Sequence, residues 1–233
     1  MKKIIIGIGE GSKYANYANW IKNEPELEII KLGYNYDNLA EIDKCHGILL
    51  TGGSDVNPRI YNQPDFLTYC DPNDIDEKRD EFEWKIMQHV EETQKPLLGI
   101  CRGMHFANVF YGGTLIPDIP AFGKFNHAKV NEEKDRQHDI LLDSHSELYK
   151  ITGDERGLVN SAHHQGVDMP GFGLVATAFS NDGIIEAMER RAPEDRSYFL
   201  LVQWHPERMQ NKESIFAKNI KNSFLQAVRN SIQ

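Results

Sequence analysis

The strongest constraint on the fold is a segment in which an apolar run, a G-x-C-x-G sequence and a helical pattern follow one another. Pro96 to Ile100 reads as a buried strand, and residues 102–111 read as a helix that begins directly after Cys101. This is the pattern of a nucleophile elbow, in which a tight strand-to-helix turn presents the nucleophile on a strained backbone. Glycines two residues before and after the cysteine leave room for such a turn, which argues against a merely buried structural thiol. The segment predicts that Cys101 is a nucleophile, with a helix N-terminus that favours its thiolate.

The remainder of the chain alternates apolar runs with amphipathic stretches, which predicts a three-layer α/β/α sandwich around a mainly parallel sheet. We expect one domain over residues 1–233, with ligands bound beyond the carboxyl ends of the strands. The segment 127–190 is richer in short β-like pieces, such as 173–179 and 184–188. The other predicted strands cover residues 3–8, 46–51 and 198–204, and the other predicted helices cover 78–93 and 212–230.

Composition excludes several classes of protein. The 233 residues carry 26 Lys and Arg against 35 Asp and Glu, a net charge of −9, whereas a nucleic-acid-binding protein needs a basic surface. No apolar run approaches the roughly 18 residues of a membrane span. Three widely separated cysteines argue against a disulfide framework and favour a reducing, cytoplasmic compartment. We therefore expect a cytoplasmic protein that contacts neither nucleic acid nor membrane.

A base for the thiol is predicted where the last apolar run ends. Residues 198–204 lead into His205, Pro206 and Glu207, so the histidine leaves the sheet at the edge where Cys101 also lies. Residues two apart in an extended segment project to the same side, so the carboxylate of Glu207 can orient the imidazole and favour its protonated form. Alone, each would be read as a surface residue, but with the elbow they complete a Cys101, His205 and Glu207 triad.

A paired glycine at another strand exit predicts an oxyanion hole. The strand at 46–51 ends in Gly52 and Gly53, where backbone amides can approach a ligand closely. The amide of Gly53, together with that of Arg102, would supply two donors. By contrast, the glycines of 7–11 lack the third glycine of a dinucleotide-binding loop and enclose an acidic residue, so we interpret them as a turn.

The remaining thiols and imidazoles carry no comparable pattern. Cys45 and Cys70 lack elbows and are interpreted as structural. The pair His163 and His164 suggests a metal, but adjacent rings diverge on a strand and no carboxylate or thiolate ligands flank them, so we expect a pocket role and no metal. Three further histidines lie in no motif that we can interpret: His127, His138 and His145.

These motifs, in this order, resemble the class I glutamine amidotransferases, and longer strings resemble their gamma-glutamyl-gamma-aminobutyrate hydrolase group, peptidase family C26. The resemblance spans about residues 46–207. The strings that carry it are Gly52-Gly53-Ser54-Asp55-Val56-Asn57-Pro58, Arg79-Asp80-Glu81-Phe82-Glu83, Gly112-Gly113-Thr114-Leu115, Val159-Asn160-Ser161-x-His163-x-Gln165 and Gln203-Trp204-His205-Pro206-Glu207.

The resemblance implies a flavodoxin-like sandwich and hydrolysis of a gamma-glutamyl amide through a gamma-glutamyl thioester, without metal or organic cofactor. It implies the same roles for Cys101, His205 and Glu207 as the residues themselves predict. It also implies substrate contacts at Gly52, His105, Asn160, Ser161, His163 and Gln165. Two positions depart from the family: His105 stands where glutamine is usual, and Tyr61-Asn62-Gln63 stands where Tyr-Gly-Glu is common.

Two alternatives share these residues. One is a glutaminase subunit that delivers ammonia to a synthase partner, and the other is a catalytically silent binding module, which His105 keeps open. The triad does not discriminate between the hydrolase and the glutaminase, whereas the 159–165 segment favours the hydrolase. The expected partner is a small gamma-glutamyl substrate, and relatives of this kind are often homodimers.

Overall fold

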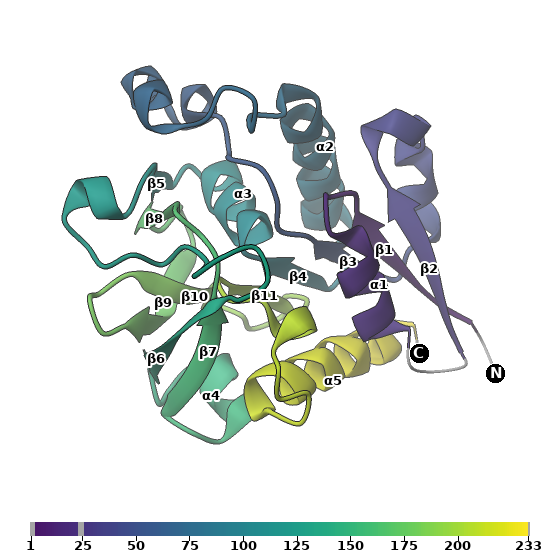
Figure 1. Cartoon of the computed structure of the whole chain (residues 1–233). Helices are drawn as coiled ribbons and strands as arrows, with labels where there is room; N and C mark the ends of the chain where they lie inside the picture. Colours follow the sequence, from purple (N-terminus) through teal and green to yellow (C-terminus); the bar gives the residue numbers. More distant parts are fainter. Residues whose placement is uncertain (1–2, 23–25, 233) are drawn as a thin grey trace.

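A computed structural model describes residues 3–22 and 26–232, and these form an eleven-stranded mixed sheet between two layers of helices (Figure 1). The predicted domain also includes positions 1–2, 23–25 and 233, which lie outside the described residues. The three-layer α/β/α sandwich predicted from the sequence is confirmed.

The first half of the sheet is parallel. Each strand pairs in parallel with its neighbour, and the sequence order crosses over, as alternating strands and helices require. In spatial order these strands are β2 (Leu27–Leu32), β1 (Ile4–Gly9), β3 (Gly47–Leu50), β4 (Leu97–Ile100) and β11 (Phe199–Val202).

The second half is antiparallel and continues the sheet from β11. It accounts for the β-like pieces expected between residues 127 and 190. In spatial order its strands are β10 (Ile185–Arg190), β9 (Leu174–Ser180), β6 (Arg136–Leu142) and β7 (Arg156–Ser161), with β8 (Gly166–Met169) pairing with β10 and with β5 (Thr114–Ile116).

Alternating side chains on the parallel strands separate two hydrophobic layers. On β3, Leu49 packs into the layer below the sheet, whereas Ile48 and Leu50 pack into the layer above it. The lower layer is covered by α1 (Tyr14–Ile21), α4 (Glu147–Thr152) and α5 (Ile215–Asn230), and the upper layer by α2 (Glu77–Thr93) and α3 (Arg102–Phe110) (Figure 1).

The apolar periods of the two long helices are the ones expected. Phe82, Ile86 and Val90 of α2 are buried in the upper layer. On α5, the apolar stripe Phe216, Ile220, Phe224 and Val228 is buried in the lower layer. Both helices pack their predicted faces on the sheet, which holds the loops at the strand ends on a rigid support.

Candidate active site

The turn after β4 has the strained geometry of a nucleophile elbow. Cys101 has φ 53° and ψ −108°, a region that L-residues rarely occupy, and α3 begins at the next residue. A Cβ on Gly103 would lie 2.5 Å from the backbone oxygen of Leu50, so a glycine is required where α3 crosses β3. The thiol is therefore fixed at the carboxyl end of β4, directly at a helix N-terminus.

His205 follows β11, the parallel neighbour of β4, and it lines the same cavity as Cys101. Its Nδ1 lies 2.9 Å from Oε1 of Glu207, which leaves Nε2 for the thiol. Burial lowers the pKa of His205, but the charges on Glu207 and Cys101 and hydrogen bonds with both outweigh burial and raise this pKa to about 9. The three side chains of the predicted triad are thus brought together, and their arrangement favours a protonated imidazole.

Tyr17 on α1 is a member of this site that the sequence did not indicate. Its hydroxyl accepts a hydrogen bond of 3.0 Å from the Gly52 amide and lies 3.3 Å from Nδ1 of His205. Burial, with the charges on Glu207 and Cys101, raises the pKa of Tyr17 well above 10, so the phenol stays neutral. The tyrosine connects the imidazole to the loop after β3 that contains Gly52 and Gly53, the predicted oxyanion loop. An aromatic residue on an amphipathic helix carries no signal that separates this role from core packing.

The oxyanion loop after β3 is held from behind by Arg79 of α2. The Arg79 guanidinium donates to the carbonyl oxygens of Gly52 at 3.2 Å and Thr51 at 3.0 Å. Because C=O and N–H point in opposite directions across a trans peptide, fixing the Gly52 carbonyl on α2 turns the Gly53 amide away from it, toward the cavity. Gly53 has φ 145°, and a Cβ there would lie 2.4 Å from Arg79 Nη1, so only glycine fits.

The side chain of Arg102 is held in the protein interior by two carboxylates. It is 1% exposed and is paired with both Asp80 and Glu83, and Glu83 also binds Arg79 at 2.8 Å. These four side chains form a buried network of two positive and two negative charges. The backbone amide of Arg102 remains at the start of α3, beside Cys101, where the predicted second oxyanion donor belongs.

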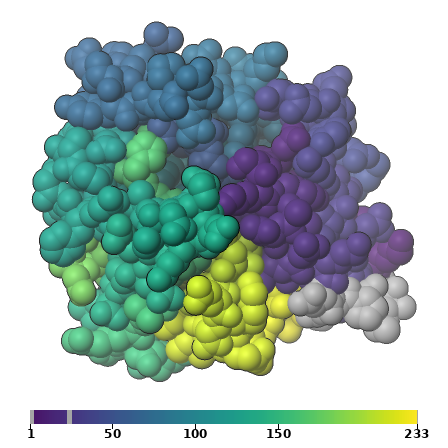
Figure 2. Space-filling view, in the orientation of Figure 1, coloured from purple at the N-terminus to yellow at the C-terminus, as the bar shows by residue number. Residues whose placement is uncertain are grey.

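A cavity of about 290 Å³ opens at the predicted triad. Its lining includes Cys101, His205, Gly53 and Arg102. Its rim combines the basic residues Lys13, Lys129 and Arg208 with the acidic residues Asp55 and Asp74. In the space-filling view, the purple N-terminal segment and the teal segment before β6 meet next to a hollow near the centre of the face (Figure 2).

Four of the six residues expected to contact substrate line this cavity: Gly52, His105, His163 and Gln165. Asn160 and Ser161 do not, which corrects the expectation. The Asn160 side chain accepts from the His205 amide at 3.1 Å and donates to Asp135, and the Ser161 hydroxyl donates to the His127 carbonyl at 2.6 Å. Both residues lie buried at the end of β7 and support the loops of the site, whereas His163 and Gln165, which follow them, line the cavity.

His105, which stands where the family usually has glutamine, is a neutral group. It is 3% exposed, and its Nε2 lies 2.6 Å from Oε1 of Gln203 on the segment after β11. Burial lowers the pKa of His105 to about 4. The imidazole therefore supplies no charge to the cavity and ties α3 to the strand exit that carries His205.

The other two cysteines are buried thiols without an elbow. Burial raises the pKa of Cys45 to about 11 and that of Cys70 to about 12, so both remain protonated and unreactive at neutral pH.

The model of the Peptidase C26 family matches residues 14–207, which include the elbow, the oxyanion loop and the histidine. This chain belongs to the Peptidase C26 family. Two relatives are the glutamine amidotransferase-like protein YvdE of Lactococcus lactis, 36% identical over 72% of this chain and 67% of its own, and protein NtpR of Enterococcus hirae, 34% identical over 72% and 69%. The gamma-glutamyl-gamma-aminobutyrate hydrolase PuuD of Escherichia coli K12 is 27% identical over 82% and 75%.

Solved structures agree on the fold of this C26 family member. The glutaminase domain of Trypanosoma brucei CTPS, solved with bound acivicin, superposes with a TM-score of 0.63 over 98% of this chain and 94% of its own, at 18% identity. A glutamine amidotransferase from Thermotoga maritima gives a TM-score of 0.59 over 99% and 86%, at 12% identity. These likenesses establish the class I glutamine amidotransferase fold. Among the described residues, no helix has the length and apolar character to cross a bilayer.

Proposed function

We propose that this protein is a cysteine hydrolase that cleaves gamma-glutamyl amide bonds. The observation that carries the proposal is that Cys101, His205 and Glu207 line one cavity, with His205 bonded to Glu207, and that Gly53 and Arg102 line the same cavity. A thiolate next to a protonated imidazole is the resting state that acyl transfer to sulfur requires. Membership of the C26 family and the likeness to PuuD support a gamma-glutamyl substrate.

In the first half of the reaction, the Cys101 thiolate attacks the gamma-carbonyl carbon, and the oxyanion is held by the Gly53 and Arg102 amides. Collapse of the tetrahedral intermediate breaks the C–N bond. His205 gives its proton to the departing amine, and a gamma-glutamyl thioester remains on sulfur.

In the second half, neutral His205 takes a proton from water, and the resulting hydroxide attacks the thioester. The C–S bond breaks, glutamate leaves and the thiolate–imidazolium pair is restored. Glu207 holds the imidazole in position throughout both halves, and its 2.9 Å contact with Nδ1 of His205 supports this role.

Asp55 adds an argument for the substrate class. Its Oδ1 is paired with His164 at 2.7 Å, and the residue lines the cavity. A carboxylate on the cavity wall fits the alpha-ammonium group that every gamma-glutamyl compound carries. The basic residues of the rim offer partners for the alpha-carboxylate.

A glutaminase that supplies ammonia to a synthase is the second candidate. It is favoured by one observation, namely that YvdE, a glutamine amidotransferase-like protein, is more similar to this chain than PuuD is. The residues of the triad serve both reactions equally, so the leaving amine decides between them.

The test is release of glutamate from a panel of gamma-glutamyl amides, including gamma-glutamyl-aminobutyrate and a gamma-glutamyl polyamine, with glutamine as the comparison. We expect the purified chain to hydrolyse a member of the panel at least about tenfold faster than glutamine, and Cys101→Ala to lose more than about 10³-fold in kcat. Activity on glutamine alone, appearing only with a synthase present, would favour the glutaminase.

Acivicin, the ligand of the Trypanosoma structure, separates both enzymes from a silent binding module. Mass spectrometry of the treated protein should locate the adduct on Cys101 and not on the protonated Cys45 or Cys70. Absence of both turnover and adduct in folded protein would contradict the proposal.

A further inference from the structure

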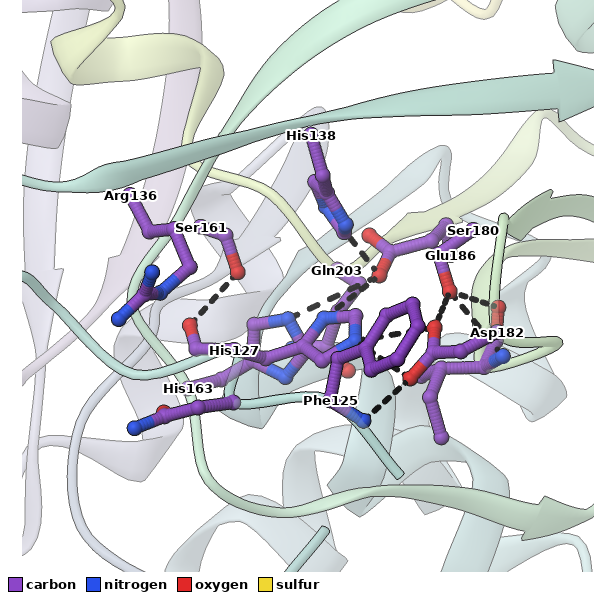
Figure 3. Close-up of polar contacts among 12 residues, drawn as sticks. Phe125, His127, Arg136, His138, Ser161, His163, Ser180, Asp182, Glu186 and Gln203 are labelled. Atoms are coloured by element: carbon purple, nitrogen blue, oxygen red, sulfur yellow. Dashed lines mark hydrogen bonds and ion pairs between the residues drawn. The ribbon is translucent and has the colours of Figure 1, made fainter. Parts of the chain in front are cut away.

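Three histidines and a glutamate meet in the antiparallel half of the sheet, outside the triad. One ligand-type atom from each of His127, His138, His163 and Glu186 lies within 4.8 Å of all the others. Figure 3 shows the three rings converging on the Glu186 carboxylate. The four residues come from the loop before β6, from β6, from the loop after β7 and from β10. Because they are far apart in the sequence, no ligand partners are visible next to His163, and the sequence predicts no metal.

The distances in this cluster are longer than those of most hydrogen bonds and are close to those between ligands around one ion. Glu186 Oε1 lies 3.5 Å from His127 Nδ1, 3.4 Å from His138 Nε2 and 3.7 Å from His163 Nε2. Four ligands placed about 2.1 Å from a tetrahedral metal are separated from one another by roughly 3.4 Å. The three distances from Glu186 therefore match those between the ligands of a zinc ion.

The atoms that face this centre have no other partners. His127 Nδ1, His138 Nε2, His163 Nε2 and both oxygens of Glu186 are buried without a hydrogen bond, and the glutamate is fully buried. A carboxylate so enclosed is costly unless a cation satisfies it. One such atom from each of the four residues lies near a common point, which indicates a missing common partner.

The far sides of two rings are already fixed as metal-binding histidines are. His127 Nε2 lies 3.2 Å from both carboxylate oxygens of Asp182, and His163 Nδ1 donates to the Gln165 carbonyl at 2.9 Å. Asp182 is itself held by the Ser180 hydroxyl and the Phe125 amide (Figure 3). Each outer contact places the ring proton away from the centre and leaves a lone pair directed into it.

We propose that His127, His138, His163 and Glu186 bind one divalent transition-metal ion, with zinc as the ion that fits best. Imidazole nitrogens suit zinc and exclude magnesium and calcium, which prefer oxygen ligands. Four protein ligands complete a tetrahedron, so the site is closed and structural, with no position for substrate.

The position of the site indicates what the ion would stabilise. His163 also lines the catalytic cavity, two residues before Gln165, and the His127 loop continues into Lys129 on the rim. The ion would tie this part of the cavity wall to β10. We therefore expect its removal to lower stability and to raise KM more than it lowers kcat.

The first measurement is the metal content of the full-length chain, incubated with zinc and freed of excess, by inductively coupled plasma and native mass spectrometry. We expect about one zinc per chain, and removal by a chelator should lower Tm by about 5 °C or more. His138→Gln is the informative variant, because its side chain is the most exposed of the four at 16%, and should reduce binding to below about 0.1 equivalent. His145→Gln, whose side chain is 93% exposed, is the matched control and should retain full binding.

Cobalt substitution in the Cys101→Ser background tests the ligand set without relying on activity. Tetrahedral cobalt on nitrogen and oxygen should show intense visible d–d bands and no sulfur-to-metal charge-transfer band. Wild-type protein that retains no zinc, a folded His138→Gln variant with undiminished binding, or a thiolate signature would each overturn the proposal. If His138→Gln does not fold, zinc stoichiometry and the cobalt spectrum on the unaltered ligands decide the matter.

Discussion

At the residue scale, Tyr17 is the least expected part of the site. Its hydroxyl satisfies the Gly52 amide and contacts Nδ1 of His205, so one atom positions both the oxyanion loop and the base. Tyr17 is a positioning residue, because its neutral phenol contacts the base and the loop and takes part in no bond making or proton transfer of the proposed mechanism.

Tyr17→Phe removes only this oxygen. We expect kcat to fall about tenfold with little change in KM, and the free energy of unfolding to fall by about 1–3 kcal/mol, because a buried amide loses its acceptor. Steady-state kinetics and urea denaturation measure the two effects. Tyr14→Phe on the same helix is the control and should leave kcat unchanged. Equal activity in both variants would show that the hydroxyl does not position the base.

Glu207 sets the pH range in which the imidazole keeps its proton. The folded pKa of His205, about 9, lies above the roughly 6.5 of an unfolded chain. Its protonation therefore contributes stability that is fully present below about pH 6.5 and is lost as pH rises through about 9.

Glu207→Gln removes the charge that raises this pKa. The alkaline limb of the kcat/KM profile should move to lower pH by about one unit or more, because the general acid loses its proton earlier. Glu213→Gln, an exposed glutamate paired with Lys218, should leave the limb in place. A limb that stays near pH 9 in Glu207→Gln would contradict the role assigned to the carboxylate.

At the element scale, α2 acts on the chemistry without reaching the cavity. Its residue Arg79 binds the Gly52 and Thr51 carbonyls, and its residues Asp80 and Glu83 bind Arg102 at the start of α3. The helix thereby fixes the relative position of the two loops whose amides form the proposed oxyanion hole.

Arg79→Lys keeps the positive charge and removes the fork that holds both carbonyls. We expect kcat to fall about 10²-fold with a smaller change in KM, comparable to the loss of one oxyanion donor. Iodoacetamide should still alkylate Cys101 at the wild-type rate, because the triad is untouched. Arg59→Lys, whose side chain is 64% exposed, should have no effect. A slower alkylation equal to the loss in kcat would mean that the variant damages the thiol instead of the loop.

Most of the parallel half could be predicted from the sequence, whereas its strand β2, its helix α1 and several antiparallel strands could not. Buried strands such as 97–100 are continuous apolar runs, and α2 and α5 have a clear helical period. In contrast, β6 exposes every second residue, β7 is buried only in its second half, and the short helix α1 buries only Tyr17, Trp20 and Ile21. Such short segments carry too few residues for a period to emerge from the sequence.

At the scale of the whole molecule, the triad was predictable because parallel neighbouring strands carry their carboxyl ends to one edge. The supporting residues were not. Arg79, Tyr17 and the His127–His138–His163–Glu186 cluster depend on the packing of distant segments, and a single sequence contains no information on which histidine faces which carboxylate. The same holds for Asn160 and Ser161, whose side chains form hydrogen bonds with residues of other segments and do not line the cavity.

The lower hydrophobic layer should determine stability independently of the chemistry. Phe224 of α5 is fully buried there, and α5 contributes no residue to the lining of the catalytic cavity. Phe224→Ala should lower the free energy of unfolding by about 3–5 kcal/mol in urea denaturation, while the folded fraction keeps its kcat. Gln226→Ala, an exposed neighbour on the same helix, should change stability by less than about 0.5 kcal/mol. A large loss of kcat in folded Phe224→Ala would show that the layer and the site are coupled.

The buried network of Arg79, Asp80, Glu83 and Arg102 also limits how this family can vary. Its charges sum to zero, and a neutral residue at any one of the four positions leaves a buried charge uncompensated, at a cost of about 3–5 kcal/mol. The loss of one charge would therefore remove a large part of the roughly 5–15 kcal/mol by which an ordinary domain is stable. Across homologous sequences, we expect these four positions to be retained as a set or replaced as a set, so that in evolution they behave as one inherited character.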